Sequence, residues 1–199
     1  MNILVFLKQV PDLVEELEID ASGVMLDSSW LRFMPSEYDE HALEQALLLK
    51  EKHGGSVHAA VLDAPDADEV LYTALAKGAD SVSKILGDFD NGVSSSHIAE
   101  MLRATVCAKP YDLILTGVQA IDDFDGPVGA LLAARLSLPY VGSVNGIDIS
   151  KDESSATVKK EYPGGVFSEI HVHMPAILGI QAAMQPPLPA AQVATATVS

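Results

Sequence analysis

The chain has 199 residues, of which 48% are hydrophobic and 20% charged, which is enough for one globular α/β domain with a sizeable core. Its 28 acidic and 12 basic residues give a formal net charge of −16, which excludes nucleic acid and anionic membranes as expected partners because both would repel this surface. The single cysteine, Cys107, excludes an internal disulfide and fits a reducing, cytoplasmic compartment, and no apolar run is as long as a membrane span requires.

Strands and helices are expected to alternate over the first two thirds of the chain. The apolar run from Asn2 to Leu7 predicts a buried strand and not a signal peptide, since it has no basic start and no cleavage site. Weak alternation around Gly23 predicts an excursion or hairpin, and a helix over 42–50 follows, with Ser36 as its cap and Gly54 as its stop. Further along, the pattern predicts strands over 56–62, 81–86 and 112–116, and helices over 66–77 and 98–106.

The loop after the strand over 112–116 is the most informative segment. It runs from Gly117 through Asp123, and a new helical pattern begins after Gly126-Pro127. Parallel strands bind ligands at their carboxyl ends, and the first turn of a helix offers unpaired N–H groups to an anion. The segment therefore predicts a ligand site, with an anionic group near the helix.

Three aspartates in this loop leave two interpretations open. Asp122, Asp123 and Asp125 could form a metal site or an acid/base pair, or Asp125 could cap the following helix while the other two order the loop. The second interpretation is favoured. If a nucleotide binds here, its phosphates would meet backbone amides and Thr116, since carboxylates repel phosphate, and the aspartates would serve ribose hydroxyls or the loop.

Other chemical candidates are weaker. His171 and His173 lie two apart on an expected strand, where an exposed strand face is favoured over a metal site. Cys107, late in an apolar helix, is expected in the core and not as a nucleophile. The chain has no Walker loop, no Gly-x-Ser-x-Gly elbow and no Cys-x-x-Cys pair, so the sequence predicts no catalytic residues of its own, and therefore no enzyme.

The pattern changes near the C-terminus. Three short strands, over 146–149, 157–161 and 167–173, predict an antiparallel meander at the edge of the sheet. We therefore expect an α/β fold: a doubly wound, mostly parallel sheet with an antiparallel C-terminal extension. Residues 1–183 would form a single nucleotide-binding domain, and residues 184–199 an arm or tail.

Four segments together resemble the beta subunit of electron-transfer flavoproteins. They occur in the family's order and span about three quarters of the chain. The segments are MNILVFLKQVPD at 1–12, Tyr38-Asp39-Glu40 with the helix ALEQALLLK at 42–50, TALAKGAD at 73–80, and the loop QAIDD at 119–123 with Gly126 and Val128-Gly129.

The resemblance implies a Rossmann-like fold of the adenine nucleotide alpha hydrolase type and a protein that shuttles electrons between dehydrogenases and an acceptor. Such subunits pair with an alpha subunit that carries the redox FAD, and they hold AMP or, in bifurcating types, a second FAD. Tyr38 would also lie near the alpha subunit's flavin. By position, the implied cofactor-binding residues are Phe6, Ser36, Tyr38, Asp39, Leu62, Asp63, Gln119, Asp122, Asp123, Phe124, Asp125, Gly126, Pro127, Val128, Gly129 and Ala133.

The chain departs from the family at two sites and at its C-terminus. The family usually has a small residue where Phe6 stands and often Asn where Ser36 stands. After Leu178 the family continues with a charged docking loop and a long arm, and here a short Pro-rich tail stands in their place, so a weaker subunit interface is expected. Met184 and Leu188 would either contact a redox partner or pack the tail. The alternative function is a stand-alone adenine-nucleotide-binding regulatory protein.

Overall fold

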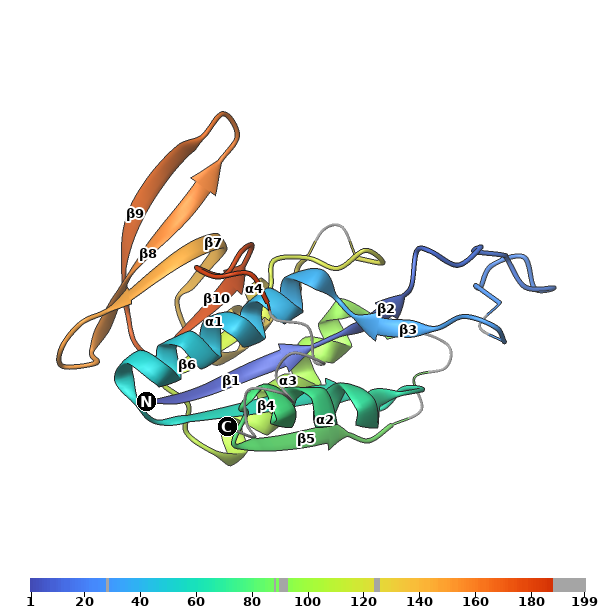
Figure 1. The fold of residues 1–199 in the computed structure, drawn as a ribbon, viewed down its shortest axis with the longest axis horizontal. Coiled ribbons are helices and arrows are strands. Elements are labelled where there is room, and N and C mark those ends of the chain that lie inside the picture. Colours follow the sequence, from blue (N-terminus) through green and yellow to red (C-terminus); the bar gives the residue numbers. More distant parts are fainter. Residues whose placement is uncertain (28, 88, 90–92, 124–125, 188–199) are drawn as a thin grey trace, which may run out of the picture.

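The computed structural model describes residues 1–27, 29–87, 89, 93–123 and 126–187, in which an eight-stranded sheet lies between two layers of helices (Figure 1). The strand order is β5-β4-β1-β6-β10-β7-β8-β9. The first six of these strands are parallel and the last two are antiparallel. The strands are β1 (Asn2–Leu7), β4 (Ser56–Leu62), β5 (Ser81–Ile85), β6 (Leu113–Gly117), β7 (Tyr140–Ile149), β8 (Ser155–Tyr162), β9 (Val166–His173) and β10 (Ala176–Ile180).

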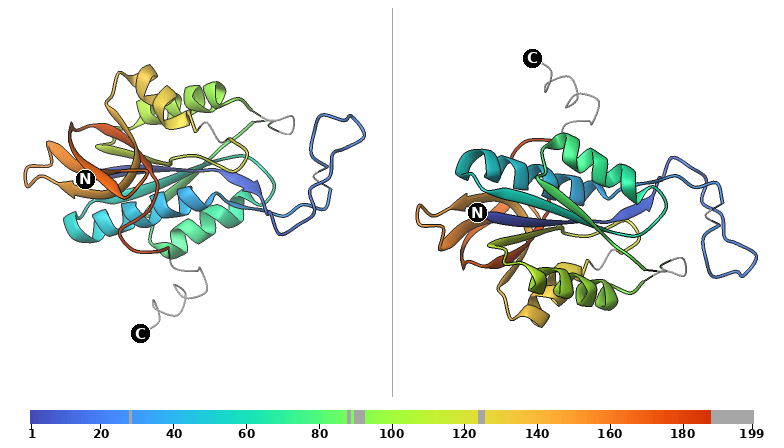
Figure 2. Two further views of the ribbon diagram at one scale, coloured as in Figure 1. Left: turned by 90° about the horizontal axis from the view of Figure 1, so that it is seen from above. Right: turned by 90° about the horizontal axis from the view of Figure 1, so that it is seen from below.

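The central strands are apolar along their whole length because both faces of the sheet are covered. In β1, Ile3 and Val5 belong to the core beneath one helical layer, whereas Leu4 and Phe6 belong to the core beneath the other. Figure 2 shows the two layers on opposite sides of the sheet. The first layer holds α1 (Glu37–His53) and α2 (Ala67–Lys77), and the second holds α3 (Ser95–Ala108) and α4 (Val128–Leu136).

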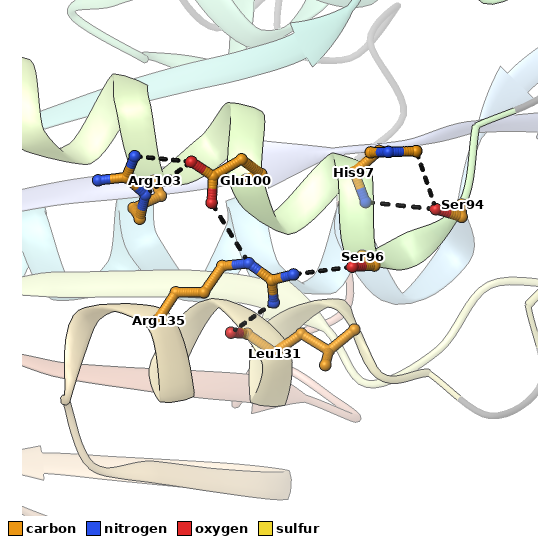
Figure 3. Close-up of polar contacts among 7 residues, drawn as sticks. All are labelled: Ser94, Ser96, His97, Glu100, Arg103, Leu131 and Arg135. Atoms are coloured by element: carbon orange, nitrogen blue, oxygen red, sulfur yellow. Dashed lines mark hydrogen bonds and ion pairs between the residues drawn. The ribbon is translucent and has the colours of Figure 1, made fainter.

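Helices α3 and α4 pack against each other and are also joined by a polar network (Figure 3). Arg135 of α4 donates to the Ser96 hydroxyl at 2.7 Å and lies 3.4 Å from the Glu100 carboxylate, which also pairs with Arg103 at 2.6 Å. Exposed ion pairs of this kind contribute at most about 1 kcal/mol each. The apolar contacts beneath them, centred on Leu102 and Leu132, therefore supply most of the stabilisation.

The order of the strands creates a switch point between β1 and β6. From β1 the chain passes through α1 to β4 and then through α2 to β5. Each of these strands lies one position nearer the same edge of the sheet. Helix α3 then returns the chain to the other side of β1, where β6 pairs with it. The connections leaving β1 and β6 diverge, so a cleft opens outside their carboxyl ends, where open α/β sheets bind ligands.

The expected doubly wound sheet with an antiparallel extension is confirmed, but two features differ from the sequence-based prediction. Strand β7 begins at Tyr140, and its first part pairs in parallel with β10 before the rest pairs with β8. Strand β10, which was not predicted, inserts between β6 and β7, and its five residues are all buried there. The β8–β9 hairpin projects from one end of the molecule (Figure 1).

Cys107 does not lie in the core, which corrects the sequence-based expectation. Its side chain is exposed. The buried side of α3 is formed by Ile98, Ala99 and Leu102. Cys107 follows Ile98 by nine residues, or two and a half helical turns, and so lies on the opposite side of the helix. His171 and His173 are exposed on β9, where His171 bonds to the Thr157 hydroxyl at 2.9 Å.

A long excursion separates β1 from α1. Strands β2 (Gln9–Pro11) and β3 (Phe33–Pro35) pair antiparallel at its base, and an Ile19–Leu26 bridge closes the expected turn around Gly23. Several large apolar side chains lie exposed along it, including Val14 at 88% and Trp30 at 90%. Among the described residues, no helix is both long and apolar enough to cross a membrane.

Central core side chains should dominate stability. Leu115, on β6, is fully buried, and replacing it with alanine should lower the free energy of unfolding by about 2–5 kcal/mol through lost burial and a cavity. Urea titration of the purified chain measures this loss. The control is Leu86→Ala, since the Leu86 side chain is 75% exposed and its truncation should cost no more than about 0.5 kcal/mol. Equal losses in the two variants would contradict the assignment of the core.

Candidate functional site: a cleft at the switch point

A small cleft of about 30 Å³ lies outside the carboxyl ends of β1 and β6. Its volume is about that of one water molecule in the liquid. It is formed by the ends of both strands, the first turn of α1, the start of α4 and the loop that precedes α4. The lining residues are Phe6, Lys8, Asp39, Thr116, Gly117, Gln119, Ala120, Asp123, Gly126 and Val128.

The Asp39 carboxylate joins the ends of the two strands. It extends from the first turn of α1, where one oxygen accepts the Gly117 N–H at 2.6 Å and the other accepts the Lys8 N–H at 2.9 Å. A Cβ on Gly117 would lie 2.7 Å from that carboxylate, so glycine is required for this close approach. Burial raises the pKa of Asp39 to about 7, although the two N–H donors and the nearby ammonium of Lys8 oppose the shift.

Asp122 and Asp123 hold the loop against the rest of the domain. The Lys8 ammonium pairs with Asp122 at 2.7 Å, and the Ser95 hydroxyl of α3 donates to Asp123 at 2.6 Å. The backbone of Asp123 also exchanges hydrogen bonds with Ala120. These contacts support the interpretation that the aspartates order the loop. Within the described ranges, no group of three or more His, Cys, Asp or Glu side chains could hold a metal ion.

Two further features of the cleft are a turn that requires glycine and a buried hydroxyl without a described partner. Gly126 has φ of +54°, and a Cβ there would collide with the carbonyl oxygen of Val118, so only glycine permits this turn. The Thr116 hydroxyl is buried and has no hydrogen-bond partner among the described residues. Buried polar groups in proteins are nearly always satisfied, which makes this hydroxyl a candidate contact for a bound molecule. The first N–H groups of α4 lie at the same place.

Comparison with known proteins identifies the family. Residues 31–199 match the electron transfer flavoprotein domain. The chain is 30% identical to the electron transfer flavoprotein subunit beta of Methylophilus methylotrophus over 94% of its own length and 72% of that protein, and 31% identical to the one of Bacillus subtilis over 94% and 71%. It is also 34% identical to the caffeyl-CoA reductase-Etf complex subunit CarD of Acetobacterium woodii, over 89% of this chain and 67% of that one. The chain belongs to the electron transfer flavoprotein beta subunit family.

Of the residues that the family resemblance implied, some line the cleft and others do not. Those in the lining are Phe6, Asp39, Gln119, Asp123, Gly126 and Val128. Tyr38 packs beside Gly117, and Asp122, Pro127 and Gly129 border the cleft through the loop and α4. Leu62 and Ala133 pack in the core on the α3 side, and Asp63 pairs with Lys84 at 3.4 Å. Phe124 and Asp125 lie outside the described residues, and so does the expected cap by Asp125.

Ser36 occupies the N-cap position of α1, as expected, but its side chain does not cap the helix. The hydroxyl lies 3.5 Å from the carbonyl oxygen of Gln119 instead. The backbone carbonyl of Ser36 accepts the N–H groups of Asp39 and Glu40 without help from the side chain. The expectation was wrong because a residue at this position can bond to a distant loop as readily as to its own helix.

One lining residue, Lys8, was not assigned to the site from the sequence. Lys8 carried a usable signal, since a lysine that directly follows a buried parallel strand must lie at the carboxyl edge of the sheet. Gly117 and Ala120 belong to the loop that the sequence predicted as a ligand site, but the need for glycine at position 117 depends on how closely α1 approaches.

The raised pKa of Asp39 should make stability depend on pH. Between the usual value of 3.8 and about 7, the folded state holds a proton on Asp39 that the unfolded state has lost, so this group's contribution to stability falls as pH rises through about 7. The difference in unfolding free energy between the natural chain and Asp39→Asn should thus fall by more than about 1 kcal/mol from about pH 5 to pH 7.

Urea titrations across this pH range measure that difference. His58, whose pKa is lowered by burial and then by Lys109, titrates in both proteins, so its effect cancels. A difference that does not change with pH would contradict a buried carboxyl with a raised pKa.

Proposed function

We propose that this chain is an electron carrier subunit that holds an adenine nucleotide, AMP or a second FAD, in the cleft at the switch point. It would pair with an FAD-binding alpha subunit and pass electrons from a dehydrogenase to an acceptor, with no catalytic residues of its own. The observation that carries the proposal is the unpartnered Thr116 hydroxyl beside the start of α4, in a chain of the electron transfer flavoprotein beta subunit family.

The charges around the cleft indicate how a nucleotide would lie. Lys8 is the one cation among the described lining residues, and its ammonium already pairs with Asp122. Phosphate oxygens would be held by Lys8, the Thr116 hydroxyl and the N–H groups of α4, while ribose hydroxyls would donate to the loop aspartates. The nucleotide would lie in the cleft against the loop, and the redox chemistry would be supplied by FAD on the alpha subunit.

The size of the cleft limits how far a nucleotide can enter it. The described cleft is small, about 30 Å³, so a purine ring would enter it more fully if residues 119–123 shifted outward. Besides the bonds from Ser95 to Asp123 and from Ser36 to the Gln119 carbonyl, weaker contacts hold the described part of this loop. They include the exposed Lys8–Asp122 pair and the backbone bonds between Ala120 and Asp123, which cost little to open.

Pairing with an alpha subunit is supported by the excursion between β2 and β3. Figure 1 shows that it extends beyond the carboxyl end of β1, the end at which the cleft opens. Val14 and Trp30 are among the exposed apolar side chains gathered on this segment. Such a cluster is more typical of a surface that binds a partner than of a surface that stays in contact with water. A partner that covers this segment would also approach the loop of the cleft.

Replacing Thr116 with valine tests the nucleotide site. Valine has the same shape but lacks the hydroxyl, so the free protein should be as stable as before or more stable, since an unsatisfied buried group is removed. Affinity for AMP, measured by calorimetric titration, should fall about 2- to 12-fold, as expected for one lost hydrogen bond. Lower stability with unchanged affinity would contradict the proposal.

A second variant closes the turn. Gly126→Val should abolish AMP binding while the domain stays folded, because the new side chain would collide with the Val118 carbonyl. The matched control is Gly164→Val, since Gly164 also has positive φ, lies in the β8–β9 turn, and has no neighbouring atom within 4 Å of the place that a Cβ would occupy. Unchanged AMP affinity in Gly126→Val would rule out binding at this loop.

The visible absorbance of the purified protein tests which subunit carries the redox flavin. The chain purified alone should lack the redox flavin and absorb little visible light, whereas co-expression with its cognate alpha subunit should yield a yellow complex. A second FAD in the cleft would be recognised because Thr116→Val should reduce the flavin content of the isolated chain. Failure to form any complex with the alpha subunit would favour the stand-alone regulatory role.

A further inference from the structure

A second cleft, larger than the first, lies between α3 and the edge strand β5. It is an open cleft of about 540 Å³, and none of its described lining residues belongs to the cleft at the switch point. The space exists because α3 presents the small side chains of Ala104, Thr105 and Ala108 where it faces β5. These small side chains leave the space between the helix and the sheet open.

The floor of this second cleft is a neutral hydrogen-bonded chain of three side chains. His58 bonds through Nδ1 to the Tyr111 hydroxyl and through Nε2 to the Ser83 hydroxyl, the latter at 2.9 Å. Burial lowers the pKa of His58, and the charge of Lys109 lowers it further. An imidazole with one donor and one acceptor nitrogen fits this chain, so the floor is polar without carrying charge.

The walls are apolar. Ile85 and Leu86, at the end of β5, lie on one side, and Met101 and Ala104 of α3 lie on the other. Leu86 is 75% exposed. Met101 is flexible and adapts to ligands of different shape. A flat or branched apolar body could bury surface against these side chains at little cost in rearrangement.

Two lysines border the second cleft, and they differ in their partners. Lys84 pairs with Asp68 at 3.0 Å and with Asp63 at 3.4 Å, so its charge is already balanced. The Lys109 ammonium lies 5.8 Å from the centre of the Tyr111 ring and has no carboxylate within 4 Å among the described residues. Such an unbalanced ammonium next to an apolar cleft favours one anionic group by a local attraction, against the general repulsion from a chain with net charge −16.

We propose that the cleft between α3 and β5 is a binding site for a compact amphipathic monoanion. The apolar or aromatic body of the ligand lies against Ile85, Met101 and Ala104, and its carboxylate pairs with the Lys109 ammonium. The neutral floor formed by His58, Ser83 and Tyr111 makes one hydrogen bond with a polar group on the body, as donor or as acceptor.

The probe is 1-naphthoate, titrated into the full chain and followed by the NMR signals of the methionine methyl groups. The Met101 signal should shift with a dissociation constant of about 1 mM, as expected for a ligand of this size. Lys109→Gln should weaken binding about five-fold, in line with one exposed ion pair. The control Lys151→Gln, an exposed lysine in the β7–β8 turn, should leave it unchanged.

Two further measurements separate this site from non-specific binding. Ala104→Trp should fill the cleft and abolish the Met101 shift, whereas Ala76→Trp, at an exposed position of α2 on the other face of the sheet, should not. The cationic probe 1-naphthylmethylammonium should bind the natural chain at least about five-fold more weakly than naphthoate. Equal binding of the two probes, or unchanged naphthoate affinity in Ala104→Trp, would overturn the proposal.

Discussion

The site depends on one buried carboxylate. Asp39 bridges the Lys8 N–H, directly after β1, and the Gly117 N–H, at the last residue of β6, where the two connections diverge. The pairing between β1 and β6 ends at Val5 and Leu115, so these two N–H groups lie beyond the ladder that joins the strands. The first turn of α1 supplies the missing acceptor, and in doing so it fixes the distance between the two strand ends and the helix.

This arrangement has an energetic cost that the surrounding structure must offset. Burial in the core favours the protonated form of a carboxyl group. The pKa of Asp39 is therefore raised to about 7 in spite of its two N–H donors. The apolar layers on both faces of β1 and β6 supply the compensating free energy. A stable core thus carries a buried polar junction whose desolvation is costly, a local exception of the kind found at functional sites.

The two clefts arise from different physical causes. The cleft at the switch point is bounded by backbone, and its shape depends on Gly117 and Gly126, where any Cβ would meet another atom. The cleft beside β5 is bounded by side chains, and it exists because α3 is lined there with small residues such as Ala104. The first is therefore sensitive to backbone geometry, whereas the second can be filled or reshaped by single substitutions on an exposed helix.

The sequence by itself determined the elements and their alternation. Apolar runs such as 2–7 and 56–62 predict buried strands, and periodic segments ended by Gly54 or Gly78 predict helices, because burial pattern and capping are local properties. The QAIDD loop and its position after a strand likewise located one wall of the candidate site.

Only the tertiary structure decided which distant residues meet. The Lys8–Asp122 pair joins residues 114 positions apart, and the bond between His58 and Tyr111 joins residues 53 positions apart. No periodic pattern in the sequence predicts either contact. The insertion of β10 between β6 and β7 and the outward position of Cys107 also follow from packing. Local patterns state which side of an element is buried, but the partner on that side is set by the strand order, which is a property of the whole chain.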